Sequence, residues 1–290
     1  MKNFMGFDGF TWFQGVVEDH NDPEQIGRVR VRCLGIHTED KEALPTDDLP
    51  WAMVMMPTTG ASVSQLGHSP SGLLKGSWVL GFFRDGNNCQ EPVVMGTFHG
   101  YPMERPNTDL GFCDPTGTHP VEIEEPDTSR LARSDKKSKL YIKKNDILNA
   151  HPAHPIANSG STWNVKSNPY NARYPYNKVQ QTESGHVIEI DDTPNAERIN
   201  IQHMSGSFIE MHPNGDIRMR SMDSEVLIEG GENVHVKGDV NLVIDSNCST
   251  YIKGDWNIQV DGNVVEKIKG NQTTTVTGNI DIDGARIDLN

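Results

Sequence analysis

The chain has 290 residues, of which 35% are hydrophobic, and its formal net charge is -14 at pH 7. This length suits two domains of ordinary size, and the acidic balance argues against nucleic-acid binding, which needs clustered Lys and Arg. The first residues, MKNFMGFDGF, hold no apolar signal-peptide region, and no stretch approaches the ~20 apolar residues of a membrane span, so we expect neither feature.

Residues 1–105 are predicted to form a small all-β domain. Its turn signals include Asn21-Asp22-Pro23 and Asp85-Gly86-Asn87. Five short strands separated by long loops are typical of an OB-fold barrel. Barrels of this kind bind many classes of ligand, so the fold alone does not decide function. The predicted strands are residues 13–18, 28–34, 51–56, 77–84 and 93–98.

Residues 106–180 are rich in Pro, Asn and Ser and carry few periodic aliphatic residues. They are predicted to be an extended connector with one short helix over residues 129–139. Residues 181–290 are predicted to form one elongated β domain. In its first part, residues 181–228, polar and apolar residues alternate around turns at Asp192–Asn195 and Pro213–Gly215, which indicates hairpin-like strands.

Residues 229–284 form seven consecutive octads, numbered here so that position one falls on Glu229 and on every eighth residue after it. Position two is Gly in six of seven octads, position three is Asp or Asn in six, and position eight is Val or Ile in six. Gly and Asx favour tight bends, whereas the residues between them have strand propensity. Each octad is therefore predicted to be a strand ending in a corner, as in a β-helix. The corner glycines are Gly230, Gly238, Gly254, Gly262, Gly270 and Gly278.

A β-helix made from one copy of this repeat would have a thin, partly polar core. Three intertwined chains would solve this problem, because each strand could pair with strands of its neighbours and no lateral edge would remain. Position eight would then stack along the trimer axis. A single-chain solenoid and an adhesin repeat are the alternatives. The predicted trimer core consists of Val236, Ile244, Ile252, Val260, Ile268 and Val276.

The barrel segments IGRVRVRCLGIHTED (26–40) and GHSPSGLLKGSWVLGFFRDG (67–86) resemble the N-terminal OB domain of the central spike proteins of T4-type phage baseplates. The segment ESGHVIEIDDTPNAERI (183–199) resembles a stretch that these spikes share with the VgrG proteins of type VI secretion. The octads resemble the spike family's Val-x-Gly repeat. Together these segments cover most of the chain.

The resemblance implies a homotrimeric needle at the centre of a contractile phage tail. It would dock on the baseplate hub through its barrels and pierce the host outer membrane when the sheath contracts. The resemblance also implies a virion protein that is assembled in the host cytoplasm. A VgrG-like secretion spike is the alternative, and a tail-associated cell-wall hydrolase is a weaker one. The T4 member of the family carries a lysozyme domain between barrel and β-helix, and a domain of ordinary size needs about 150 residues. The 106–180 connector is too short for such a domain, so we expect no enzyme.

Catalytic and metal motifs give little support to other functions. The pairs Asp191-Asp192 and Glu124-Glu125 lie on adjacent residues, which face opposite ways on a strand, and no G-x-S-x-G, H-E-x-x-H or P-loop motif occurs. His151 and His154 lack a third ligand nearby. We therefore predict no cofactor, no metal site and no catalytic residue. On a trimer axis, His203, His212 and His235 could each form a ring of three histidines, and the four cysteines are expected to be reduced thiols.

The C-terminal segment IDIDGARIDLN (280–290) alternates apolar and polar residues. An open β-helix end exposes unpaired strand edges that would promote aggregation. We therefore expect a small tip protein of the PAAR type to cap this end. Ile282, Ile287 and Leu289 are its predicted contacts.

Overall fold

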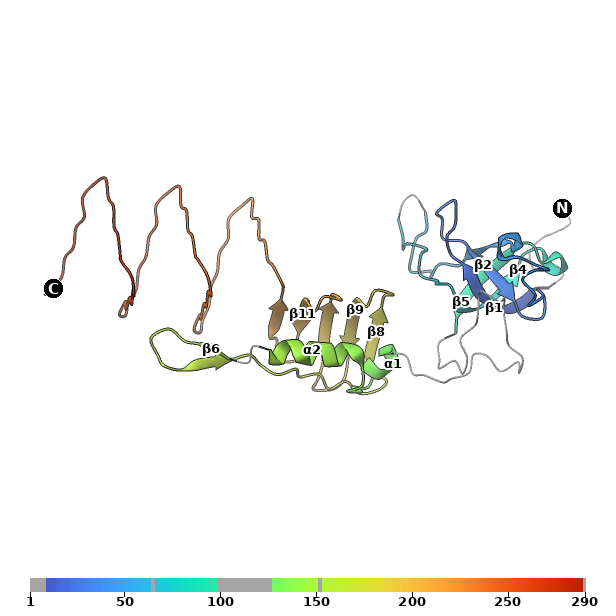
Figure 1. Ribbon diagram of the computed structural model, residues 1–290, viewed down its shortest axis with the longest axis horizontal. Coiled ribbons are helices and arrows are strands. Elements are labelled where there is room, and N and C mark those ends of the chain that lie inside the picture. Colours follow the sequence, from blue (N-terminus) through green and yellow to red (C-terminus); the bar gives the residue numbers. More distant parts are fainter. Residues whose placement is uncertain (1–8, 64–65, 99–126, 151–152, 289–290) are drawn as a thin grey trace. The chain divides into compact units, whose positions relative to one another are not determined.

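A computed structural model describes residues 9–63, 66–98, 127–150 and 153–288 (Figure 1). The chain divides into two compact units. The first comprises residues up to Asn145 together with Pro169–Ser224, and the second comprises Asp146–Asn168 with the chain from Glu225 onward.

The N-terminal part of the first unit is a closed five-stranded barrel, which confirms the predicted OB-type domain. The strands close the barrel in the order β1-β2-β3-β5-β4, and β3 and β5 form the parallel pair. Two short 3-10 helices, Thr46–Asp48 and Gly86–Asn88, lie in its loops. The strands are β1 (Thr11–Asp19), β2 (Val29–Cys33), β3 (Trp51–Val54), β4 (Trp78–Phe83) and β5 (Pro92–Thr97).

The barrel has an apolar core and, outside that core beneath the β2–β3 loop, one buried ion pair. Phe13, Val31 and Phe83 belong to the core cluster. Arg32 is fully buried, and its Nε lies 2.6 Å from Oε1 of Glu18. The same guanidinium donates to the carbonyls of residues 38 and 44 at 2.7 and 2.8 Å, so the pair also holds the β2–β3 loop on the barrel.

The connector contains two helices, α1 (Asp127–Leu131) and α2 (Lys139–Asn149), so the prediction of a single helix over 129–139 is wrong. The helix is interrupted because Ser134 adopts a left-handed φ of 59°. Ser138 then caps α2, with its hydroxyl oxygen accepting from the amide of Tyr141 at 3.3 Å. Strands β6 (Ala153–Pro155) and β7 (Thr162–Asn164) form a separate hairpin in what was predicted to be extended chain.

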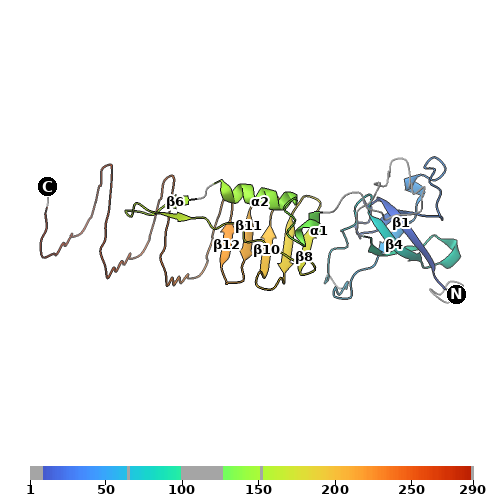
Figure 2. The ribbon, with the colours of Figure 1, turned by 90° about the horizontal axis from the view of Figure 1, so that it is seen from below.

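The second part of the first unit is a five-stranded antiparallel sheet in simple chain order. Three of its four connections are the same tight turn, in which the amide of Gly185, Gly206 or Gly215 donates back to the carbonyl three residues earlier. Each of these glycines has a positive φ, which a side chain would strain. Figures 1 and 2 show α2 lying along one face of this sheet. The strands are β8 (Asn177–Gln181), β9 (Val187–Asp191), β10 (Arg198–Gln202), β11 (Phe208–Met211) and β12 (Ile217–Arg220).

The octads run as extended segments joined by bends that recur every eight residues, at positions one and two (Figure 1). Within 229–288 no residue belongs to a strand and no backbone group bonds to another backbone group of the chain. No atom lies within 4 Å of a Cβ placed on any of the corner glycines. The bends agree with the predicted corners, and the intertwined β-helix stays a prediction because the single chain supplies none of its strand pairing.

Candidate functional site

The five-stranded sheet has the reverse of the usual polarity for a sheet covered by helices. Along β9, β10 and β11 buried and exposed residues alternate strictly. The buried residues are mostly charged or polar, such as Glu189, Asn200 and Glu210. Every exposed residue on these three strands is Ile or Met. Because strand side chains alternate between two faces, one face is polar and covered, and the other is apolar and open.

The apolar face extends over four neighbouring strands. In the β10 register Ile199 pairs with Ile190 and Met211, and Ile201 pairs with Ile188 and Ile209. The eight side chains are between 42% and 74% exposed, and so large a contiguous apolar surface is typical of a protein interface. We call this surface the isoleucine face, and it consists of Ile188, Ile190, Ile199, Ile201, Ile209, Met211, Ile217 and Met219.

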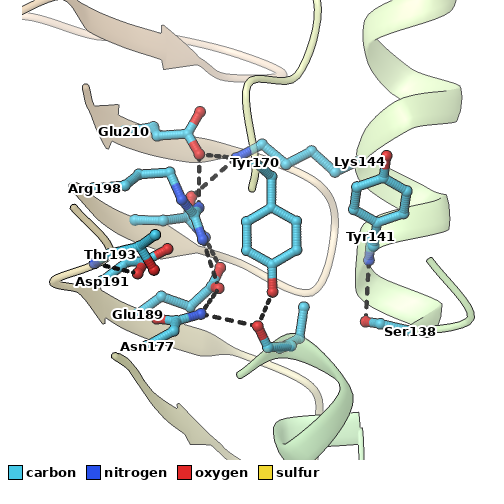
Figure 3. Close-up of polar contacts among 12 residues, drawn as sticks. Ser138, Tyr141, Lys144, Tyr170, Asn177, Glu189, Asp191, Thr193, Arg198 and Glu210 are labelled. Atoms are coloured by element: carbon cyan, nitrogen blue, oxygen red, sulfur yellow. Dashed lines mark hydrogen bonds and ion pairs between the residues drawn. The ribbon is translucent and has the colours of Figure 1, made fainter. Parts of the chain in front are cut away.

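The covered face holds a network of ion pairs that joins α2 to the sheet (Figure 3). Lys144 of α2 places Nζ 2.6 Å from Oε1 of Glu210 and 3.2 Å from the amide oxygen of Asn200. Arg198 donates from one terminal nitrogen to Glu210 at 2.7 Å and from the other to Glu189 at 2.6 Å. The two cations and two carboxylates therefore neutralise one another in a buried setting, which such groups need in order to remain charged.

Neutral groups complete this network. Asn200 and Asn177 each donate an amide hydrogen to Glu189 at 2.9 Å. The ring of Tyr170 lies 4.5 Å from the guanidinium carbon of Arg198, and its hydroxyl donates to the carbonyl of Leu131 in α1. These contacts fix the side-chain geometry and hold both helices on the polar face, so the isoleucine face is the open face of this sheet.

The buried charges shift one another's protonation. Burial alone would raise the pKa of Glu210, but the adjacent Lys144 and Arg198 outweigh it and hold this pKa below its usual 4.5. Burial lowers the pKa of His212, whose Nε2 lies 3.2 Å from Oε2 of Glu210. Both shifts favour the deprotonated forms in the folded chain.

We expect acid to weaken the attachment of α2 to the sheet. A carboxylate with a depressed folded pKa stabilises the fold above its unfolded pKa, near 4.5 for Glu210, and loses that contribution as pH falls through the folded value. His212 acts in the same direction below its ordinary 6.5, because only the unfolded chain then gains its proton. Thermal unfolding at a series of pH values from 7 to 3 should show a falling Tm, and the variant Glu210→Gln should flatten the lower part of this curve. Equal slopes in the two proteins would contradict the assignment to Glu210.

The barrel carries a second exposed apolar surface. Trp12 on β1 and Leu80 on β4 are 54% and 40% exposed, and Met53 on β3 and Met95 on β5 are 52% and 45% exposed. These four strands are consecutive neighbours around the barrel. Trp12 packs on Phe82, with ring centroids 5.7 Å apart, so the aromatic part of this surface is held in place.

The structure places the predicted site residues on the open octads. The six predicted core residues of position eight are 43–52% exposed, whereas Val240 and Trp256 at position four and Leu242 at position six are 70–78% exposed. Ile282 and Ile287 are exposed, and Leu289 lies outside the described residues. The isoleucine face was missed as a site, although the alternation of residues 187–211 is visible in the sequence.

The histidine and carboxylate candidates have ordinary contacts. His212 is buried beside Glu210, His203 stacks on His186 with centroids 4.4 Å apart, and His235 is exposed on the octads. Asp191 is buried and Asp192 forms an exposed ion pair with Lys178, so the two carboxylates face apart as expected. His154 stacks on Trp163, and His151, Glu124 and Glu125 lie outside the described residues.

Metal-binding clusters and membrane-spanning helices are absent from the described ranges. There, no group of three or more His, Cys, Asp or Glu side chains is arranged to hold a metal ion. In the same ranges, no helix has the length and apolar character needed to cross a bilayer. Cys33, Cys89 and Cys248 are free thiols, and Cys113 lies outside the described part.

Comparisons with known proteins agree with this architecture. Protein Gp5 of Vibrio phage KVP40 is 36% identical over 273 residues, which cover 83% of this chain and 65% of that protein. The pre-baseplate central spike protein Gp5 of Enterobacteria phage T4 is 42% identical over 121 residues, covering 40% of this chain and 21% of that protein. The chain thus spans less than two thirds of the length of either relative.

A family model described as the Gp5 N-terminal OB domain matches residues 35–202. The match runs from the residues after β2 through β10, so it includes most of the barrel and the first three strands of the five-stranded β8–β12 sheet. It covers more than half of the chain. With its closed five-stranded barrel, this chain therefore belongs to the family of the Gp5 N-terminal OB domain.

Proposed function

We propose that this chain is a structural subunit of the central spike of a contractile phage tail baseplate and that it works as a homotrimer. The isoleucine face carries the proposal. Its eight Ile and Met side chains are exposed in the single chain, while the opposite face is already covered by helices. Burying one such side chain completely is worth about 1.5–3 kcal/mol, so a face of this size favours association strongly.

Three copies are a natural arrangement for this surface. Three sheets can turn their isoleucine faces toward a common axis and form a closed triangular core, with α2 of each chain on the outside. The octads begin at Glu229, after a short segment that follows β12, and carry unpaired backbone groups. Pairing them between chains would satisfy those groups and continue the apolar core through position eight, as a trimeric β-helix.

Such a shaft suits a mechanical role. Its backbone hydrogen bonds would join different chains, so bending or local opening would require many bonds to break together. The relative from phage T4 is named a pre-baseplate central spike protein. By analogy, we assign this chain to the virion tail baseplate, where it would pierce the host outer membrane on sheath contraction. The proposal gives the chain no catalytic step.

The two ends of the spike would have different partners. The exposed surface of Trp12, Met53, Leu80 and Met95 is suited to docking of the barrel on a hub protein of the baseplate. At the other end, the exposed Ile282 and Ile287 are suited to binding a small PAAR-type tip protein. The second contact would cover strand edges that the last octads leave open.

The mass of the purified protein in solution tests the proposal directly. We expect a species near three times 32.2 kDa that stays assembled in SDS without boiling. Analytical ultracentrifugation and unboiled gels would measure this, and a zymogram on cell-wall substrate should show no clearing. A folded monomer at micromolar concentration would overturn the trimer, and cell-wall cleavage would overturn the purely structural role.

The substitution Val260→Asp tests the octads separately. Position eight faces the axis in the proposed β-helix, so the variant would bring three carboxylates together in a buried setting. We expect the octads to remain unpaired and the SDS resistance to be lost. A control substitution of the exposed Val265→Asp at position five should leave assembly intact. Normal SDS resistance of the Val260 variant would show that position eight does not face the axis.

A further inference from the structure

Position one of the octads carries charges whose sign alternates without exception over six consecutive octads. Each of these residues stands at a bend, directly before a residue of position two. None of them forms an ion pair within its own chain in the described octads. The series is Glu229, Lys237, Asp245, Lys253, Asp261 and Lys269, and it ends at the uncharged Thr277.

Successive members of this series cannot contact each other within one chain. An extended octad spans roughly 26 Å at about 3.3 Å per residue. A Lys–carboxylate pair needs its charged atoms within about 4 Å. A contact between charges of neighbouring octads in this series therefore has to join two different chains.

The symmetry of the proposed trimer determines which residues become neighbours; this step rests on the proposed function. If each octad occupies one side of a triangular shaft and climbs one strand spacing, octad n of one chain lies beside octad n+1 of the next chain. The vertical spacing between them is about 4.8 Å. Along each edge of the shaft, position one then presents Glu229, Lys237, Asp245 and so on, with the three chains alternating.

We propose that position one is an interchain charge ladder that sets the register in which the three chains assemble. Every charge in the ladder lies between two charges of opposite sign from the other chains, except at its two ends. Opposite charges on directly neighbouring strands stabilise a sheet, and like charges destabilise it. The partner that this surface recognises is thus a second copy of the same chain, displaced by one octad.

A repeat of nearly equivalent octads needs a feature that sets the register between chains. Glycine corners and aliphatic core positions do not set it, because they fit equally well after a slip of one octad. If one chain slips by one octad, each of its charges meets a charge of the same sign on both sides. The smallest register error therefore changes every attractive contact of that chain into a repulsive one. A slip of two octads restores the signs but leaves two octads without partners.

Position three also avoids like charges on neighbouring octads. In the octads that begin at residues 237, 245, 253 and 261 it reads Asp239, Asn247, Asp255 and Asn263. The two aspartates are thus separated by a neutral residue in the proposed stacking. Like charges are avoided between neighbouring octads here as well, although the bend requires only Asx.

Reversing one charge in the middle of the ladder tests the proposal. The variant Lys253→Glu would place three acidic residues in succession along each edge, at 245, 253 and 261. The matched control is Lys267→Glu, which makes the same charge change at position seven, where the neighbouring octads present the uncharged Gln259 and Thr275. We expect dissociation in SDS to become roughly tenfold faster for Lys253→Glu at low salt and to change little for the control, with the difference shrinking at high salt. A further variant that reverses all six charges should regain normal dissociation.

Register is read by disulfide mapping in a Cys248→Ser background that carries Ser249→Cys and Asn257→Cys, both at position five. We expect interchain disulfides between residues 249 and 257 and none between two copies of 249. In the Lys253→Glu variant, disulfides between identical residues should appear. The outcomes separate the two proposals. A wild-type monomer overturns the trimer itself, whereas a wild-type trimer in which Lys253→Glu and Lys267→Glu behave alike overturns only the ladder.

Discussion

The variant Ile201→Asp is expected to be a folded monomer. Ile201 lies on the central strand β10, is 53% exposed in the single chain, and has Ile188 and Ile209 as its cross-strand neighbours. In the proposed trimer three such carboxylates would meet near the axis without a cationic partner. An uncompensated buried charge costs several kcal/mol, and three copies multiply that cost, so the trimer population should fall by several orders of magnitude.

Mass in solution would measure this effect, and far-UV circular dichroism would show whether the barrel and the sheet remain folded. Ile36→Asp is the matched control, because Ile36 is an exposed isoleucine of the barrel that lies outside the isoleucine face. That control should assemble like the natural protein. A stable trimer of the Ile201 variant would mean that the isoleucine face is not the interface between chains.

The variant Glu210→Gln is expected to loosen α2 from the sheet by about 3–5 kcal/mol, because it leaves Lys144 and Arg198 buried with one carboxylate fewer. Glu210 is 1% exposed and accepts from both cations through the same oxygen. Hydrogen exchange of the β10 and β11 amides should therefore become faster by two orders of magnitude or more. Thermal unfolding should report the same change as a lower Tm.

Asp192→Asn is the matched control for this prediction, because it removes a carboxylate from the same sheet. Asp192 forms its ion pair with Lys178 on the surface, with both side chains more than half exposed. Exposed ion pairs contribute about 0.2–1 kcal/mol, so this variant should be close to the natural protein. Equal effects of the two substitutions would show that the buried network does not hold α2 in place.

In the β8–β12 sheet, attachment of the helices and burial of the apolar face are separate steps, because they involve opposite faces of the sheet. Ion pairs and hydrogen bonds fasten the helices to one face within the single chain, as Figure 3 shows for Lys144, Arg198 and Glu210. The apolar surface, which supplies most of the driving force for burial, is left for contacts with other chains. A subunit of this kind can fold its polar layer by itself and still depend on association to remove its isoleucines from water.

The sequence predicted the barrel well because its strands follow the usual rule. They bury apolar residues such as Phe13, Val31 and Phe83, and each predicted strand overlaps an observed one. The same rule failed for α2, whose buried residue is Lys144. A helix that buries a charged side chain has no apolar stripe, so hydrophobic periodicity gives no signal for the position of α2.

By itself, the sequence determined the five barrel strands and the eight-residue spacing of the bends, because these features depend on local alternation, on Gly and on Asx. Only the tertiary structure decided which face of the β8–β12 sheet is covered. That choice depends on Lys144 reaching Glu210 across 66 residues of sequence, and such a contact leaves no mark in local periodicity. Alternation shows that two faces differ, whereas the location of the partner decides which face is buried.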